Sequence, residues 1–303
     1  DDCAPTPTAL EKLLEAIEDR PQVAMAGPKL LGWHDRTHIL EAGISIAGNG
    51  ARWTGLETDE YDQGQHDGVH EVLSVSTAGA LIRRDIFEEL GGFDSNLSLF
   101  RDDIDFGWRA RVAGHGVIAT TAAVAHHAQA SASERRSVDV NGAFLHRPLL
   151  LDRRNAAYVL LANSSWWMIP WLSIQLLASA MARAIGYLLA KLPGYAADEL
   201  LAVATLIIKP AEIVKARKFR KTHRLVSARV ISSYIPPRWS QIRLSAARIA
   251  EVIRARVIPV PESSSTSVLN SLEEEDLLVP TQRFQISKLL QNPAIFGYLL
   301  LGM

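Results

Sequence analysis

Three aspartates, Asp102, Asp103 and Asp105, form the densest acidic cluster in the sequence. They stand at the start of a helix that the pattern predicts over residues 102–113. Helix N-termini favour anions, so capping accounts for one or two of these carboxylates. A carboxylate held ionised there can also take the proton of an acceptor hydroxyl, a contribution on the order of 10² to 10⁴ in rate. Arg109 either orients one of the carboxylates or forms a plain salt bridge.

A second acidic pair, Asp1 and Asp2, precedes Cys3-Ala-Pro5 and a helix predicted over residues 8–17. This order would place the carboxylates at a strand end, where α/β folds bind ligands. Hard carboxylate oxygens suit Mg²⁺ or Mn²⁺ bridging a diphosphate. A surface turn is the competing interpretation.

Two histidines, His126 and His127, end an apolar and β-branched strand predicted over residues 116–125. Neighbouring strand residues point to opposite faces, so only one of the two imidazoles can face a given site. Imidazole suits Mn²⁺ well and Mg²⁺ poorly. A metal ligand and a structural histidine are equally good interpretations.

The elements that must position these residues alternate between strand-like and helix-like runs up to about residue 130, which predicts an α/β fold. We expect a short buried strand over residues 23–26, a strand over residues 72–82 and a helix over residues 84–90. The small residues 76–80 would let a ligand come close. The polar, glycine-rich segment 48–68 is predicted to be a long functional loop.

Composition separates the chain into two halves. Of 303 residues 48% are hydrophobic, which excludes a mostly disordered protein. Residues 1–150 hold 23 Asp/Glu against 13 Lys/Arg, and the remainder holds 10 against 19. A basic half interrupted by apolar runs favours a surface facing anionic lipid over one that binds nucleic acid. The single cysteine, Cys3, excludes an intrachain disulfide and fits a reducing compartment.

Residues 156–182 contain no Asp, Glu, Lys or Arg. This stretch exceeds the roughly 20 apolar residues needed to span a bilayer. Trp166, Trp167 and Trp171 gather at one end of it, as in the aromatic belt of a membrane interface. A buried helix of a soluble domain is the alternative, but such helices seldom run this long without a polar face.

Pro193-Gly194 predicts a turn, after which residues 200–208 form a second apolar segment that leads into seven cations between residues 209 and 224. Arg153 and Arg154 precede the first apolar segment, so the basic residues on both sides of the two segments favour the cytoplasm, and this favours a helical hairpin or two interfacial helices over one span. The sequence thus predicts a catalytic domain over residues 1–150 and a membrane-associated helical hairpin over residues 151–224. A basic amphipathic helical region (225–258), a linker (259–290) and the start of a truncated membrane helix (291–303) follow.

The linked order of the motifs strongly resembles the family 2 glycosyltransferases of GT-A fold, particularly bacterial rhamnosyl- and galactofuranosyltransferase-like members. The resemblance covers residues 1 to about 135. Its specificity comes from the series, which is Asp1-Asp2-Cys-Ala-Pro5, Gly79-Ala-Leu-Ile-Arg-Arg-Asp85, Gly91-Gly-Phe-Asp94, Asp102-Asp-Ile-Asp105 with Arg109, and His126.

The resemblance implies a partial GT-A fold, whose nucleotide-binding first part would precede residue 1. Asp1 and Asp2 match the middle and last positions of the family's metal-binding Asp-X-Asp-type motif, and His126, or else His127, matches a further metal ligand for Mn²⁺ or Mg²⁺. Asp103 matches the general base. Asp102, Asp105 and Arg109 are then supporting residues.

The implied reaction is an inverting single displacement that moves a hexose-like sugar from a nucleotide-diphosphate donor to a glycan or lipid-linked glycan in cell-envelope synthesis. A membrane segment after the catalytic domain would keep the active site near lipid at the bacterial inner membrane, with the catalytic domain cytoplasmic. Candidate acceptor contacts are Trp53, Thr77, Ala78, Gly79 and Trp108, although a core position is the competing interpretation for Trp108.

Two functions of other classes compete with transfer. Asp1, Asp2, Asp102, Asp103 and His126 could assemble a metal-dependent phosphohydrolase with water as nucleophile, but no dinuclear spacing such as His-X-Asp is present. A non-catalytic membrane scaffold with a vestigial transferase domain is the other. Retention of all the candidate carboxylates argues against it.

Overall fold

The computed structural model describes residues 2–57, 59–128, 148–189, 193–208 and 210–236. Asp1, most of the predicted basic region 225–258, the predicted linker 259–290 and the predicted helix start 291–303 lie outside the described residues.

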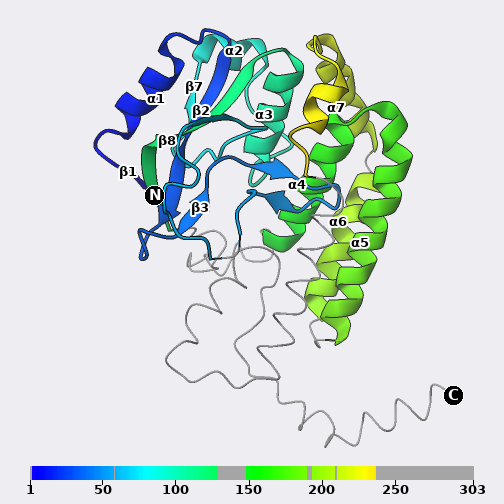
Figure 1. Cartoon of the computed structure of the whole chain (residues 1–303). Coiled ribbons are helices and arrows are strands. Elements are labelled where there is room, and N and C mark those ends of the chain that lie inside the picture. Colours follow the sequence, from blue (N-terminus) through cyan, green and yellow to red (C-terminus); the bar gives the residue numbers. More distant parts are fainter. Residues whose placement is uncertain (1, 58, 129–147, 190–192, 209, 237–303) are drawn as a thin grey trace, which may run out of the picture. The chain divides into compact units, whose positions relative to one another are not determined.

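A mixed β-sheet forms the centre of the first half (Figure 1). Its two long strands, β2 and β8, run parallel, and β1 and β3 flank them antiparallel in the order β1-β8-β2-β3. Two short strands, β6 and β7, pair with β8 and β2, while β4 and β5 form a separate hairpin. The strands are β1 (Cys3–Pro5), β2 (Val23–Gly32), β3 (Ile39–Glu41), β4 (Ser45–Ile46), β5 (Arg52–Trp53), β6 (Val69–Glu71), β7 (Leu81–Ile82) and β8 (Gly116–His127).

Strand β2 is longer than the sequence predicts, because it continues through Gly27-Pro28 to Gly32 and is buried throughout. Proline has no N–H to give to a ladder. The register between β2 and β8 shifts between Pro28 and Lys29, where a missing donor disturbs the ladder least. The strand expected over residues 72–82 is in turn shorter, with only β7 at its end and an isolated bridge at Ser74.

Helices cover both faces of the sheet, in agreement with the predicted α/β fold. On one face α1 (Ala9–Glu18) packs Leu13 against Ile118. On the other face α2 (Arg84–Glu89) and α3 (Asp102–Val112) pack Phe106 against Met25. These three helices lie within two residues of the predicted boundaries.

The second half is helical, and its helices are α4 (Pro148–Asn163), α5 (Ile169–Leu189), α6 (Pro193–Ile208), α7 (Pro210–Thr222) and α8 (Ala228–Ser232). The uncharged stretch 156–182 is therefore not one helix, because the chain breaks between α4 and α5 around the short 3₁₀ turn Trp166–Met168. Pro193-Gly194 begins α6 instead of forming a turn. Proline suits the first helical position because that N–H has no helical partner.

Helix α4 joins the two halves through one hydrophobic core. Its Ala156 and Tyr158 belong to the same buried cluster as Ile104 and Trp108 of α3 and Leu176 of α5. Helix α5 lies beside α6 (Figure 1). The core thus continues across residue 150, where the sequence predicts a domain boundary.

One helix among the described residues, Trp166–Leu188, is long and apolar enough to cross a membrane by length and composition. It has 23 residues and a mean hydropathy of 1.3.

Candidate functional site

The acidic helix α3 begins at a strained turn. Phe100 and Arg101 have φ values of 61° and 68°, a left-handed conformation that costs energy in residues other than glycine. Two residues of helix α4 bind this turn. Arg101 Nε and Nη2 donate to the Asp152 carboxylate at 2.7 and 3.0 Å, and Asn155 Nδ2 donates to the carbonyl oxygen of Phe100. The position of the acidic pair that follows therefore depends on the helical half of the chain.

Asp103 is 5% exposed and forms an ion pair that the sequence does not reveal. Its Oδ2 accepts a hydrogen bond from Arg52 Nη1 at 3.0 Å, and Arg52 also binds both carboxylate oxygens of Glu41, at 2.8 and 3.2 Å. Burial alone would lower the pKa of Arg52, but the charges of Asp103 and Glu41 more than reverse this and raise it. Arg52 therefore keeps Asp103 beside a permanent positive charge.

The neighbouring Asp102 lies in a different environment. Its side chain is half-buried, and burial raises the pKa of its carboxyl. The charge of Asp103 raises this pKa further. Of the two adjacent carboxyls, only Asp103 accepts a hydrogen bond from the Arg52 guanidinium.

Asp105 and Arg109 are part of a buried network instead of lying open to a ligand. Asp105 is fully buried, and it accepts hydrogen bonds from Arg109 Nε at 2.7 Å, Arg220 Nη2 at 2.6 Å and Asn163 Nδ2 at 2.7 Å. Arg109 also donates to the carbonyl oxygen of Leu90 at 2.7 Å. Arg109 therefore forms a salt bridge, which was one of its two predicted roles. The network links α3 to α4 through Asn163 and to α7 through Arg220.

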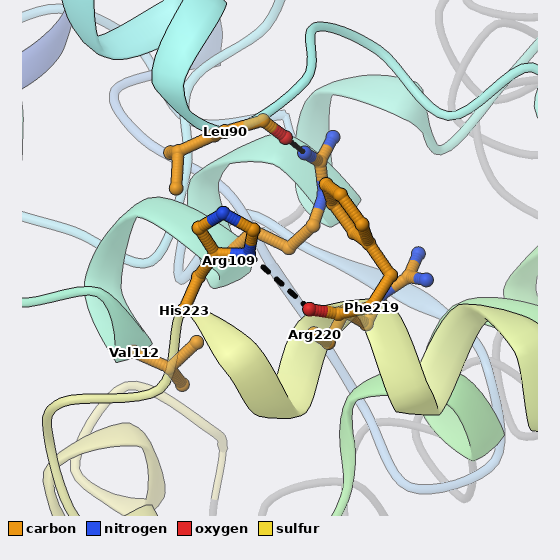
Figure 2. Close-up of a pocket in the computed structure, with 6 residues that line it drawn as sticks. All are labelled: Leu90, Arg109, Val112, Phe219, Arg220 and His223. Atoms are coloured by element: carbon orange, nitrogen blue, oxygen red, sulfur yellow. Dashed lines mark hydrogen bonds between the residues drawn. The ribbon is translucent and has the colours of Figure 1, made fainter.

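Figure 2 shows where Arg109 meets α7. Leu90, Arg109, Val112, Phe219, Arg220 and His223 line a cavity of about 10 Å³. That volume holds about one water molecule and no sugar. This part of α3 is therefore a packing junction between α3 and α7.

At the end of the sheet, the structure brings Asp2 beside His127. Strand β1 pairs with β8 so that Cys3 lies opposite His127, and Asp2 Oδ2 is 3.5 Å from His127 Nε2. Because side chains alternate along β8, His126 faces the other way, and its Nδ1 is buried without a hydrogen-bond partner in the described part of the chain. Geometry therefore favours His127, the alternative imidazole, as the companion of Asp2. Among the described residues no three His, Cys, Asp or Glu side chains cluster as a metal site.

The two polar centres share one region of the sheet. Glu41 stands on β3, two strands from β8, which is about 10 Å sideways from His127 at the usual strand spacing. Gly79 lies over the strands between them, because a β-carbon there would be 3.2 Å from Pro28 Cγ and 3.7 Å from Ala125 Cβ. Its φ of +96° also favours glycine.

The candidate acceptor residues fall into two groups. Trp53 follows Arg52 on β5 and is half-buried, while Thr77 is exposed and Ala78 and Gly79 are half-buried. Trp108 is 3% exposed in the hydrophobic core, so it takes the core position that was the competing interpretation.

The loop that carries Trp53 is fixed to the sheet by a buried lysine. Lys29 on β2 is 5% exposed, and its Nζ lies 2.6 Å from Asp62 and 3.2 Å from Asp67. The predicted long loop 48–68 thus contains β5 and is anchored near its far end.

Comparison with known proteins locates the likeness in the α/β half. Residues 1–139 match the model of the family described as Glycosyltransferase like family 2. The O-antigen biosynthesis protein RfbC of Myxococcus xanthus is 29% identical over 136 residues, which is 41% of this chain and 10% of that protein. The chain therefore spans a small part of the length of this curated relative. A crystal structure of GalNAc-T7 with UDP, GalNAc and Mn²⁺ aligns with a TM-score of 0.35 and 12% identity, over 53% of this chain and 30% of that one.

Proposed function

We propose that residues 1–139, which match the model of the glycosyltransferase like family 2 that the motif series resembles, carry the acceptor-binding side and the general base of an inverting, nucleotide-sugar-dependent glycosyltransferase of cell-envelope polysaccharide synthesis. The observation that carries the proposal is the N-terminus of α3, where Asp103 is buried and accepts a hydrogen bond from Arg52, which also binds Glu41 on β3.

Asp103 acts as the general base. Its carboxylate takes the proton of the acceptor hydroxyl as the hydroxyl oxygen bonds to the anomeric carbon of the donor sugar. The bond from that carbon to the diphosphate breaks on the opposite side, so the configuration inverts. Between turnovers Arg52 donates a hydrogen bond to Asp103, and Glu41 shares the guanidinium so that Asp103 does not hold it alone. A positioned base contributes on the order of 10² to 10⁴ in rate.

Asp2 and His127 suit a divalent cation. A carboxylate oxygen and an imidazole nitrogen 3.5 Å apart are donors that Mn²⁺ accepts readily, and Mg²⁺ would rely more on the carboxylates Asp2 and Asp1. The bound cation would neutralise the leaving diphosphate. His126 remains the second candidate imidazole.

The acceptor is a glycan or a lipid-linked glycan. The half-buried Trp53 on β5 is a candidate aromatic contact for a sugar, although it points to the opposite face of β5 from Arg52, and the exposed Thr77 with the small Ala78 and Gly79 is the other candidate acceptor contact. The apolar helix Trp166–Leu188 would keep this site at membrane lipid, on the cytoplasmic side of a bacterial inner membrane.

The test uses membranes that contain the complete protein, a panel of nucleotide sugars and Mn²⁺ or Mg²⁺. We expect acceptor-dependent release of nucleoside diphosphate, and a fall of about 10² to 10⁴ with Asp103→Asn. Asp85→Asn, which changes an exposed carboxylate in the first turn of α2, is the matched control and should leave the rate unchanged. Nuclear magnetic resonance of the product should show inverted anomeric configuration.

Full turnover with Asp103→Asn would overturn the assignment of the base. Release of inorganic phosphate from a phosphoester without any sugar acceptor would instead support the phosphohydrolase.

A further inference from the structure

Helix α5 has a continuous apolar stripe that no described residue covers. Its side chains recur every three or four residues, which places them on one face of the helix. The stripe consists of Ile174, Leu177, Met181, Ile185 and Leu188, which are 44–63% exposed, and it begins at Trp166, Trp167 and Trp171, which are 51–78% exposed.

The opposite face of α5 is packed against protein along the whole helix. Leu172 and Leu176 near one end and Ala184 and Tyr187 near the other are all buried. Leu176 belongs to the core cluster shared with the α/β half, and Tyr187 packs with residues of α4 and α6.

One contact fixes the level of α5 relative to the α/β half. A β-carbon at Gly48 would lie 3.0 Å from Gln175 Nε2, so Gln175 touches the turn between β4 and β5. Arg52 with its partners Glu41 and Asp103 lies only four residues further along that segment. If α5 crossed a bilayer, this turn would lie at hydrocarbon depth, where unsatisfied and charged groups cost several kcal/mol each.

We therefore propose that α5 lies in the plane of the membrane surface, with its apolar stripe inserted into one leaflet of an anionic bilayer and without spanning it. The proposal rests on the membrane association stated under the proposed function, and it specifies that the helix lies along the bilayer surface instead of crossing the bilayer. Only the stripe enters the acyl region, and the α/β half with Asp103 stays in water.

Charge at one end of α5 supports a bilayer as the occupant. Helices α5 and α6 are antiparallel neighbours, so the tryptophan end of α5 meets the end of α6, where Ile208 is 75% exposed and α7 begins (Figure 1). On α7 the side chains of Lys215, Lys218 and Lys221 are exposed. Exposed tryptophans on α5, together with exposed lysines on the helix that follows α6, suit a headgroup layer with anionic lipid.

Depth measurements test the orientation. In the full chain with Cys3→Ser, Ile174→Cys and Ile185→Cys are each labelled with an environment-sensitive dye and bound to phosphatidylcholine vesicles containing phosphatidylglycerol. The two positions are eleven residues apart, so a spanning helix would separate them by about 16 Å in depth. We expect equal quenching of both labels by lipids brominated near the glycerol end and weak quenching by lipids brominated near the methyl end. Unequal depths would overturn the proposal.

Flotation with the same vesicles tests the surface. We expect Ile174→Asp and Lys218→Glu to reduce the bound fraction several-fold, while Leu10→Glu, which changes an equally exposed leucine on α1, leaves it unchanged. A wild-type chain that fails to float, or a solution dimer that shields both labels from solvent, would overturn the proposal. If the wild-type chain binds the vesicles but membranes containing it transfer no sugar, only the proposed function is overturned.

Discussion

Replacing Asp105 by asparagine tests whether buried charge holds α3 to the helical half. Asp105 is fully buried, and two guanidinium groups contact it, at 2.7 Å from Arg109 and 2.6 Å from Arg220. Asparagine has nearly the same size, but its amide is neutral and presents an NH₂ group in place of one of the two oxygens, so one of the two arginines loses its acceptor. The substitution therefore leaves two buried cations without their shared anion.

The magnitude follows from those contacts. Removing one partner of a buried ion pair costs about 3 to 5 kcal/mol. Arg220 keeps Asp94 at 2.8 Å, and Arg109 keeps its bonds to backbone carbonyls, so we expect about 3 kcal/mol, the lower end of that range. For a folded unit of this size, that corresponds to a fall in Tm of roughly 6 to 12 °C.

The assay is thermal and urea unfolding of the full chain, followed by circular dichroism. Asp102→Asn is the matched control, because it makes the same change three residues earlier on the same helix. Burial and Asp103 raise the pKa of Asp102, so its charge is unfavourable at neutral pH and its removal should leave stability unchanged or higher. A variant Asp105→Asn within about 1 kcal/mol of the wild-type free energy of unfolding, about a third of the smallest cost of breaking a buried ion pair, would refute the reasoning.

Three further predictions concern packing, pH and metal. In Gly107→Ala the new β-carbon would meet the Ser74 hydroxyl oxygen and the Leu73 carbonyl oxygen at 2.5 Å, so urea unfolding should show a loss of about 1 to 3 kcal/mol. Gly186→Ala on α5 meets nothing within 4 Å, so the same assay should show a gain of up to about 1 kcal/mol. Burial alone would raise the pKa of Asp94, but the Asn96 backbone N–H and Arg220 outweigh it and lower this pKa to about 2. Because the folded value lies below the unfolded one, the stabilisation is complete above about pH 4 and is lost as the pH falls toward 2. Asp94→Asn should therefore flatten the dependence of unfolding free energy on pH in that window, and an unchanged slope would contradict the assignment. Chelation should abolish transfer by the complete protein, with Mn²⁺ restoring it better than Mg²⁺; His127→Ala should remove the preference for Mn²⁺, and a preference that is lost only in His126→Ala would assign the metal to the other imidazole.

The start of α3 and the end of β8 could be predicted because their signals are local. An acidic cluster marks a helix N-terminus, and a β-branched run marks a strand, whatever lies elsewhere in the chain. The different roles of Asp102, Asp103 and Asp105 could not be predicted. All three are the same residue type within four positions, and only tertiary burial and the distant Arg52 and Arg220 distinguish them.

The uncharged stretch 156–182 shows a second limit of composition. A helix buried in protein and a helix facing lipid both lack charge, so the stretch predicts neither partner by itself. The structure divides it at the break after Asn163, whose side chain donates to Asp105 within the core, and leaves exposed large apolar side chains only in the second part. The β2 strand was underestimated for a related reason, since Gly27-Pro28 is a turn signal unless neighbouring strands supply the ladder.

The contact between Arg220 and Asp105 sets an order of events during synthesis. Asp105 leaves the ribosome more than a hundred residues before Arg220, and in the folded protein Arg220 Nη2 lies 2.6 Å from Asp105 Oδ1. Until α7 is synthesised, Asp105 on α3 lacks its partner Arg220. Until α4 is synthesised, the turn before α3 also lacks Asp152, the partner of Arg101. A nascent chain that ends near residue 139 therefore contains all the residues that match the family model and the Arg52 partner of Asp103, and still lacks Asp152 and Arg220, which hold the turn and the helix that carry Asp103.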